Sequence, residues 1–333
     1  MARPSESPKD DILRLPLTTV LDLLIAILTA RGFTRSRAWR CAYTFTENSL
    51  VGGPSHGLNR FPRFVEWIDR ERIDVDAHPS RLDSHGAFER WDGKLGPGPV
   101  NAARAMHRAM RIALRYGIGC VALSNTNHWL RAGSYVARAA EKGFLAVCTT
   151  NTEPNLAAWG TDEACVGNNP IALSVPRTDG HHVVFDGALS QFSYGSLERA
   201  ARRGETLPVP GGFNESGDPT TNPAEILRSQ RALPIGYWKG SALSLLLDLF
   251  VSGLADGRST REIGQLDAEH GVCQLFVAFA PFLLTPHAIA TLEQTLANYP
   301  TRYPGQRAHR AREENRARGV PVDATVWSTI HTL

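Results

Sequence analysis

The segment Pro54–Arg63 places an imidazole and a guanidinium within one helical turn of each other. It reads PSHGLNRFPR, with His56 between a serine and Gly57, and with Arg60 four residues after the histidine. A histidine with an ordinary pKa of about 6.5 gives or takes a proton at cellular pH, and a guanidinium fits the shape of a carboxylate. The pair is suited to protonating a carbonyl oxygen while holding the acid group beside it. On these residues alone, a loop histidine that bonds only to the backbone is the simpler alternative.

A second polar pair, Asn127 and His128, lies between a predicted strand at Cys120–Leu123 and a predicted helix at Ala132–Glu141. Ligands collect at strand ends of this kind, and helix N-termini attract anions. The pair is therefore a candidate for the lining of a substrate pocket. The alternative is that Asn127 caps the helix while His128 fills space.

Two charged residues occupy similar positions further along the chain. Asp186 follows an apolar strand at Val183–Phe185, and Lys239 precedes Gly240 at the start of an apolar helix. A lysine at a helix start can meet a phosphate or a carboxamide. Both residues also have ordinary explanations, since an aspartate after a strand often forms a turn and a lysine at a helix end is often solvated.

An alternation of strands and helices must position these residues. A helix that ends at Gly117 precedes the strand at Cys120–Leu123, and the helix at Ala132–Glu141 leads to a strand at Phe144–Thr149. This β-α-β order predicts an α/β sheet.

Three later segments have distinct compositions. Residues 201–235 contain many Gly, Pro, Asn and Arg residues and few apolar ones, which predicts a long surface excursion. Gly240–Leu254 is apolar nearly all round, which predicts a helix deep inside the protein. Gly305–Gly319 is predicted to form a charged helix.

The composition is typical of a cytosolic enzyme. The chain has 333 residues, of which 42% are apolar and 21% charged, so it can bury a large core. The net charge of +3 is too small to indicate a nucleic-acid partner, and glutamates interrupt the basic tail at Arg302–Arg318. The segment around Lys9 is too polar for a signal peptide, and the apolar run Leu17–Ala30 is short for a bilayer. The five cysteines are scattered, as in a protein with reduced thiols. We therefore expect a cytoplasmic protein with no membrane partner.

The common short motifs are absent. No G-x-G-x-x-G follows a predicted strand, and no glycine-rich segment ends in the Gly-Lys-Ser/Thr of a P-loop. No G-x-S-x-G is present. No H-x-x-x-H or C-x-x-C pair offers a metal site, so we expect no bound metal. Without these motifs, the sequence patterns indicate an α/β enzyme but do not specify its chemistry.

Taken together and in order, the polar segments resemble the malate/L-lactate dehydrogenase family, whose members are oxidoreductases that lack a Rossmann fold. The resemblance spans roughly residues 15–333. It rests on the stretches SHGLNRFPRF (55–64), NHWLRAGSY (127–135), AAEKG (139–143), NPIALSVP (169–176), FSYG (192–195), LPIGYWKGS (233–241) and VDATVW (322–327).

The resemblance implies a fold, an assembly and ligands. The fold is an α/β cofactor domain with a largely antiparallel, non-Rossmann sheet, joined to a helical domain built from both ends of the chain. We accordingly expect residues 1–90 with 282–333 to be mainly helical, and residues 91–281 to bind the cofactor. The implied assembly is a homodimer with its site near the subunit interface. The implied ligands are NADH or NADPH and a small 2-keto acid.

The resemblance also implies roles for individual residues. Family members transfer hydride between a nicotinamide cofactor and a 2-keto or 2-hydroxy acid. His56 is then the proton donor to the carbonyl, and Asp186 keeps the imidazole charged and oriented. The expected substrate-binding residues are Ser55, Arg60, Asn127 and His128. The expected cofactor-binding residues are His182, Val183, Val184, Phe185, Asp186, Gly187, Ala188, Trp238, Lys239, Gly305, Gln306 and Arg307.

Two of these positions depart from the family pattern and leave alternatives open. Ala188 stands where a hydroxyl is usual, and Arg307 stands where an acidic residue would bind ribose hydroxyls. Because arginine suits a 2′-phosphate better, we expect tolerance of, or preference for, NADPH. A dehydrogenase of another 2-hydroxy acid (malate, lactate or ureidoglycolate) or an imino-acid reductase is the alternative within the class. The alternative from another class is a non-catalytic ligand-binding homologue.

Overall fold

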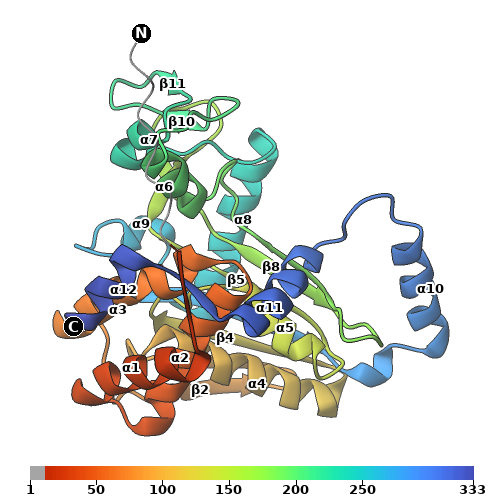
Figure 1. The fold of residues 1–333 in the computed structure, drawn as a ribbon. Helices are drawn as coiled ribbons and strands as arrows, with labels where there is room; N and C mark the ends of the chain where they lie inside the picture. The colour runs from red at the N-terminus through yellow and green to blue at the C-terminus, as the bar shows by residue number, and fades with distance from the viewer. Residues whose placement is uncertain (1–11) are drawn as a thin grey trace.

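The structure is a computed structural model that describes residues 12–333 (Figure 1). The prediction that the chain does not begin with a signal peptide concerns residues 1–11, which lie outside the described residues. The strands are β1 (Ile12–Leu15), β2 (Ser80–His85), β3 (Phe88–Asp92), β4 (Ile118–Thr126), β5 (Leu145–Thr150), β6 (Pro154–Ala157), β7 (Ala164–Gly167), β8 (Ile171–Val175), β9 (Val183–Gly187), β10 (Gly212–Phe213), β11 (Pro219–Thr220), β12 (Val272–Phe279) and β13 (Val320–Asp323). The helices are α1 (Leu17–Ala30), α2 (Arg35–Leu50), α3 (Phe61–Asp69), α4 (Gly98–Tyr116), α5 (Gly133–Ala140), α6 (Tyr194–Arg202), α7 (Pro223–Ser229), α8 (Trp238–Ala255), α9 (Thr260–Ile263), α10 (Pro286–Ala297), α11 (Gln306–Arg318) and α12 (Ala324–His331).

A seven-stranded sheet in the order β2-β3-β4-β12-β5-β8-β9 forms the centre of the molecule. Every neighbouring pair in it is antiparallel except β3 and β4, which run parallel. Because β12 lies between β4 and β5, those two strands point the same way and α5 makes the crossover between them. This arrangement confirms the predicted α/β fold with a largely antiparallel sheet.

Helices cover both faces of this sheet. Successive residues of a strand point to opposite faces, and β4 shows the result. Val121 and Leu123 are buried in the main core with the apolar residues of α4 and α5. Ala122 is buried in a separate cluster with Val251 and Ala255 of α8. The sheet is therefore the middle layer between α4 with α5 on one side and α8 on the other.

Both ends of the described chain form one helical unit. β1 pairs with β13 in an antiparallel ribbon, and α1, α2, α3 and α12 share one apolar core with this ribbon. α11 packs on α2, and Arg312 of α11 forms ion pairs with Glu47 and Glu141. Figure 1 shows the red N-terminal helices beside the blue C-terminal ones. β2 and the start of β3 belong to the large sheet although they precede residue 90, and the domain boundaries stay a prediction.

The expectation of a plain surface excursion at residues 201–235 is wrong. This segment contains α7, β10 and β11. Together with α6 and the β6–β7 ribbon it encloses a small apolar core, to which it contributes Leu207, Ile226 and Ala232. A few well-spaced apolar residues are enough to form the core of a unit of this size. The unit stands above the sheet and forms one wall of the site described below (Figure 1).

The prediction that Gly240–Leu254 lies deep inside the protein is also wrong. The buried positions of α8 are mostly small or polar, and Asp248 Oδ1 accepts hydrogen bonds from Asn151 Nδ2 (2.8 Å) and the Thr260 N–H (2.9 Å). Among the described helices α8 is long and apolar enough to cross a membrane, but a helix packed on a core passes the same test. Most of its large apolar side chains are exposed; they are Trp238, Leu243, Leu245, Leu246, Leu249 and Phe250.

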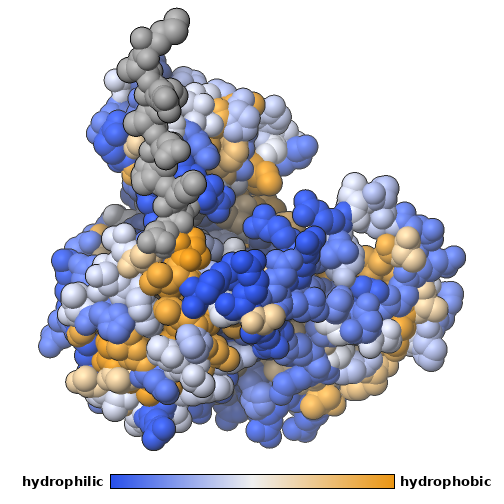
Figure 2. Space-filling view, viewed as in Figure 1, coloured by the Kyte–Doolittle hydropathy of each residue, from blue (hydrophilic) through white to orange (hydrophobic). Residues whose placement is uncertain are grey.

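The rest of the visible surface is mostly hydrophilic. Figure 2 shows hydrophilic side chains over α11, and hydrophobic ones gathered mainly over α1 and along α10. α10 projects from the body of the molecule at the end of a loop, and none of its residues is buried (Figure 1).

Candidate active site

The bend that carries His56 is held tightly against α2. Two 3₁₀ turns, Pro54–His56 and Leu58–Arg60, connect α2 to α3. Asn48 Nδ2 donates to the His56 carbonyl (2.8 Å), and the Leu58 N–H donates to Ser49 Oγ (2.9 Å). A Cβ at Gly57 would lie 2.3 Å from Ser49 Oγ, so only glycine allows this approach. The backbone on both sides of Gly57 is therefore anchored.

The His56 ring is oriented by its neighbour in the sequence. Nδ1 lies 3.1 Å from Ser55 Oγ, which leaves Nε2 as the ring atom available to a substrate. The ring stacks on that of His128, with centroids 5.7 Å apart and planes 17° apart. Desolvation lowers the pKa of His56, and the positive charge of Arg60 lowers it further, while Asp186 acts in the opposite direction. In the free protein the imidazole is thus mainly neutral at pH 7.

Arg60 is a cation for which residues 12–333 provide no side-chain partner. It lines the same cavity as His56, and no side chain of residues 12–333 forms a hydrogen bond or ion pair with its guanidinium. Burial and the nearby Arg63 lower the pKa of Arg60, whereas Glu269 and Glu198 raise it. A half-buried guanidinium whose donors are unused is suited to an incoming carboxylate.

His128 and Asn127 have different surroundings. His128 lines the cavity, and its Nδ1 accepts a hydrogen bond from the Leu130 N–H (3.1 Å). Asn127 is buried beneath it and outside the cavity lining. Its Nδ2 donates to the carbonyls of Leu95 (2.6 Å) and Arg72 (3.2 Å). The geometry gives Asn127 a supporting role in the loop, and its contact with substrate stays a prediction.

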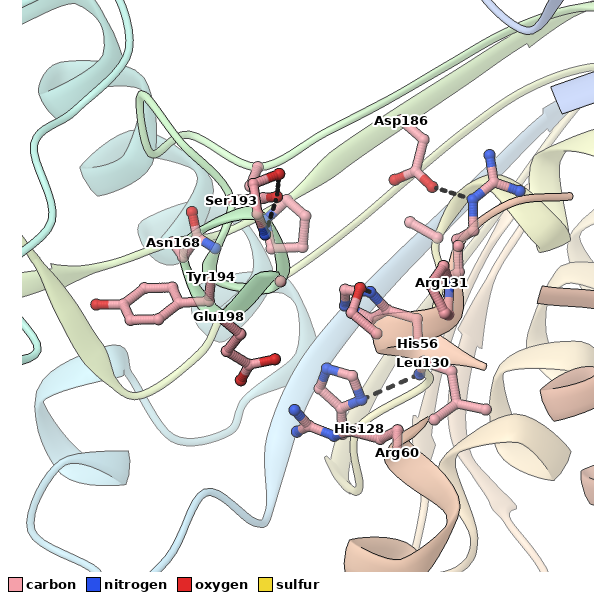
Figure 3. Close-up of a pocket in the computed structure, with 18 of the residues that line it drawn as sticks. His56, Arg60, His128, Leu130, Arg131, Asn168, Asp186, Ser193, Tyr194 and Glu198 are labelled. Carbon is pink, nitrogen blue, oxygen red and sulfur yellow. Dashed lines mark hydrogen bonds and ion pairs between the residues drawn. The ribbon is translucent and has the colours of Figure 1, made fainter. Parts of the chain in front are cut away.

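Asp186 lies on the cavity wall but does not bond to the imidazole. Its Oδ2 accepts a hydrogen bond from the Gly133 N–H (3.0 Å) and pairs with Arg131 Nε (3.0 Å). Figure 3 shows this pair above the two stacked histidines. Because Ser55 occupies Nδ1 of His56, the serine orients the ring, and Asp186 acts on it through charge.

The structure brings two of the expected cofactor-binding stretches together. The Val184 N–H donates to the Pro304 carbonyl (3.0 Å), so the turn before α11 lies against β9. Of the expected residues, Val184, Phe185, Asp186, Ala188, Gly305 and Arg307 line the cavity that contains His56. The others lie outside this lining; they are His182, Val183, Gly187, Trp238, Lys239 and Gln306. Trp238 is exposed at the start of α8.

The cavity has a volume of about 690 Å³ and walls from three parts of the chain. The His56 bend and β9 face the small unit, whose α6 contributes Tyr194 and Glu198 (Figure 3). Sequence reasoning missed Glu198 as well as the buried Glu269, whose pKa is raised by burial and by the nearby Glu153. It also missed Arg131, although this residue lies inside a stretch that carried the resemblance. None of the described residues forms a cluster fit for a metal ion.

Comparisons with known proteins show the family to which the chain belongs. Residues 15–331 match the malate/L-lactate dehydrogenases. The chain belongs to this family. It is 40% identical over 320 residues to the 2,3-diketo-L-gulonate reductase of Citrobacter koseri, covering 92% of this chain and 96% of that protein. The match confirms the family resemblance and identifies the protein as an oxidoreductase acting on CH–OH groups.

Solved structures share the fold over nearly the whole chain. A dehydrogenase from Sinorhizobium meliloti matches with a TM-score of 0.88 and 26% identity, covering 97% of this chain and 98% of the other. A Δ1-piperideine-2-carboxylate reductase from Pseudomonas syringae pv. tomato matches with a TM-score of 0.87 and 27% identity, covering 96% and 99%.

Dehydrogenases of this family generally use nicotinamide cofactors, and the cavity fits such a group. Its volume is within the range of about 300–1,000 Å³ that is usual for ligand sites. Three of its lining arginines, Arg199, Arg202 and Arg307, have no ion-pair partner within the described part of the chain, so they can face phosphates. β9 and the turn at 304–307 would hold the group against the wall opposite α6.

Proposed function

We propose that the protein is an NAD(P)H-dependent reductase of 2-keto acids, with 2,3-diketo-L-gulonate as the substrate and 3-keto-L-gulonate as the product. The observation that carries the proposal is the pairing of His56, whose Nδ1 is anchored, with the unpartnered guanidinium of Arg60 in one cavity. The choice of substrate is supported by the 40% identity to the Citrobacter koseri enzyme.

The residues divide the chemistry between them. A bound nicotinamide supplies hydride to the carbonyl carbon. His56 gives a proton from Nε2 to the carbonyl oxygen, so that the ketone gains hydride and proton and becomes an alcohol. A positioned general acid contributes on the order of 10²–10⁴ in rate. Arg60 holds the substrate carboxylate, which orients the reacting carbon. Entry of that carboxylate also offsets the charge of Arg60, which favours the protonated imidazole.

The test is a substrate panel with a matched pair of histidine variants. Oxidation of NADH and NADPH is followed at 340 nm with 2,3-diketo-L-gulonate, pyruvate and oxaloacetate. We expect the highest kcat/KM with 2,3-diketo-L-gulonate. His56→Ala should lower turnover by two or more orders of magnitude with little change in cofactor affinity. His85→Ala, on the exposed β2–β3 hairpin, is the control and should keep full turnover. Full turnover in His56→Ala would remove His56 from the mechanism.

A second substrate class is supported by the Pseudomonas syringae relative, which is named for an imino acid. The site could accept an imine of a carboxylic acid in the same way, since His56 would then protonate nitrogen. Adding Δ1-piperideine-2-carboxylate to the panel separates the two. A protein that binds NAD(P)H but reduces no member of the panel would be a non-catalytic homologue.

We also propose that the enzyme accepts NADPH at least as well as NADH. Arg307 lines the cavity at the start of α11, and within residues 12–333 its guanidinium has no ion-pair partner. A 2′-phosphate would supply one. Fluorescence titration of both cofactors tests this, and Arg307→Glu should shift the preference toward NADH. Tighter binding of NADH by the parent protein would contradict the proposal.

We propose further that two copies pair through α8 in a cytoplasmic homodimer. The exposed apolar side chains of α8 include Leu249 (56% exposed) and Phe250 (60% exposed), which a second copy could cover. Trp238 and Lys239 begin the same helix and do not line the cavity of their own subunit. This is expected if the cofactor lies near the subunit interface. Phe250→Asp should give a monomer in light scattering. Leu114→Asp, an equally exposed position on α4, is the control.

A further inference from the structure

One oxygen of Asp186 is fixed by two donors, whereas the other has none. Oδ2 accepts from the Gly133 N–H and pairs with Arg131 Nε, both at 3.0 Å. Oδ1 accepts no hydrogen bond from any residue in 12–333. Both side chains are largely buried, with 18% of Asp186 and 19% of Arg131 exposed. The two residues form an enclosed ion pair on the wall of the cavity (Figure 3).

The backbone of α5 is shaped to receive this carboxylate. A Cβ at Gly133 would lie 2.7 Å from Asp186 Oδ2 and 2.9 Å from Arg131 Nη2. Any side chain at position 133 would therefore push the carboxylate away from the N–H that binds it. Glycine at the first residue of α5 and arginine two residues earlier together make a docking point for a residue that is 53 positions away in the chain.

This ion pair lies beside the imidazole that handles the proton. Four titratable or charged groups face His56: Arg60 from the turn before α3, His128 from the end of β4, Arg131 from the segment before α5, and Asp186 from β9. Desolvation lowers the pKa of His56 most, Arg60 and Arg131 lower it further, and Asp186 raises it. The two members of the ion pair therefore act on the imidazole in opposite directions.

We propose that Arg131 is a positioning residue of the reaction: it docks Asp186 on the cavity wall and offsets the field of that carboxylate at His56. Together with desolvation and the charge of Arg60, this keeps the imidazole neutral in the empty site, and the ring gains its proton when the anionic substrate occupies Arg60. This inference rests on the proposed function, in which His56 is the proton donor. Arg131 itself touches neither Nε2 of His56 nor the reacting carbon in this scheme.

The test compares a charge-removing variant on each side of the pair. Arg131→Gln keeps an N–H donor but loses the charge, Asp186→Asn removes the carboxylate, and Arg131→Lys retains a cation. The pKa of the His56 ring is measured by NMR in the free protein, and the pH profile of kcat/KM for reduction is measured alongside it. Lys142→Gln, a cation lost two residues beyond the C-terminal end of α5, is the matched control.

The expected shifts have opposite signs. Arg131→Gln should raise the ring pKa and move the falling limb of the profile to higher pH by about one unit. Asp186→Asn should move both in the other direction. The double variant should return close to the parent, and Arg131→Lys and Lys142→Gln should leave the limb in place.

A purely structural pair would behave differently. Loss of turnover in both single variants with no movement of the ring pKa, or movement in the same direction, would overturn the proposal. If Arg131→Gln does not fold, Asp186→Asn alone tests the proposal. An unchanged or higher pKa of the His56 ring in that variant would contradict the proposal. Failure of the parent to reduce any 2-keto acid would instead refute the proposed function, and the ring titration would still report on the pair.

Discussion

The close approach of Gly57 to α2 predicts a large effect from one added methyl group. In Gly57→Ala the new Cβ would lie 2.3 Å from Ser49 Oγ, 2.8 Å from Ser49 N and 3.1 Å from the Phe45 carbonyl. Two of these atoms belong to the backbone of a buried helix, so the bend must move away rather than α2. That movement breaks the hydrogen bonds of the bend to Asn48 and Ser49.

The magnitude follows from these contacts. Each lost hydrogen bond costs about 0.5–1.5 kcal/mol, and overpacking a close-packed site costs about 1–3 kcal/mol. Gly57→Ala should therefore lower the free energy of unfolding by about 2–6 kcal/mol. Because a displacement of roughly 1 Å at a reacting group can cost about 10²-fold in rate, kcat/KM for reduction should fall by about that factor. Cofactor affinity should change little, since β9 and the turn at 304–307 are untouched.

Urea unfolding and reduction kinetics at saturating cofactor measure both effects. Gly253→Ala is the control, since no atom outside its own helix lies within 4 Å of the added carbon, and helix propensity predicts a gain of up to about 1 kcal/mol. A Gly57→Ala protein with the parent's unfolding midpoint and turnover within twofold of the parent would refute the reasoning. The bend would then not depend on contact with α2.

Three further predictions concern protonation, substrate binding and stability. Since the pKa of His56 in the free protein is below its usual value and reduction needs the protonated ring, kcat/KM for reduction should fall as pH rises from 6 to 8; a rise would contradict the assignment. Arg60→Met should raise KM for the keto acid about 10- to 100-fold with a smaller change in kcat, as expected for lost charged hydrogen bonds, and Arg60→Lys should lie between. Glu89 is buried and paired with Arg108, which holds the pKa of this carboxyl below its usual value. Glu89→Gln should cost about 3–5 kcal/mol in urea unfolding at pH 7, whereas Glu66→Gln, from the exposed pair with Arg70, should cost less than about 1 kcal/mol. The contribution of Glu89 should be lost as pH falls through its folded-state pKa.

Local features of the fold could be predicted from the sequence. The glycine after His56 and the strand–helix–strand order around α5 are both short-range patterns, and the structure contains each of them. The family resemblance extended this to the antiparallel sheet, which pattern reading alone did not reach. Ser55, Arg60, His128 and Asp186 do line one cavity with His56.

The wrong predictions concern segments whose burial is decided by packing against residues far away in the chain. Composition predicted that α8 is buried, but its buried positions are mostly small or polar residues such as Ser244 and Asp248, and most of its leucines are exposed. The spacing of apolar residues does not show which face of a helix is buried when nearly every position is apolar. Residues 201–235 were misjudged for a related reason, because their few apolar side chains complete a core begun by α6 and β6.

The sequence by itself determined the residue types that can do the chemistry, the tight bend that presents His56, and membership of a dehydrogenase family. Only the tertiary structure decided that Ser55 rather than Asp186 bonds to the imidazole, and that Arg131 takes the carboxylate of Asp186. The physical reason is distance along the chain. A bend depends on neighbours a few residues away, whereas the partner of a buried charge depends on which strand the sheet places beside it.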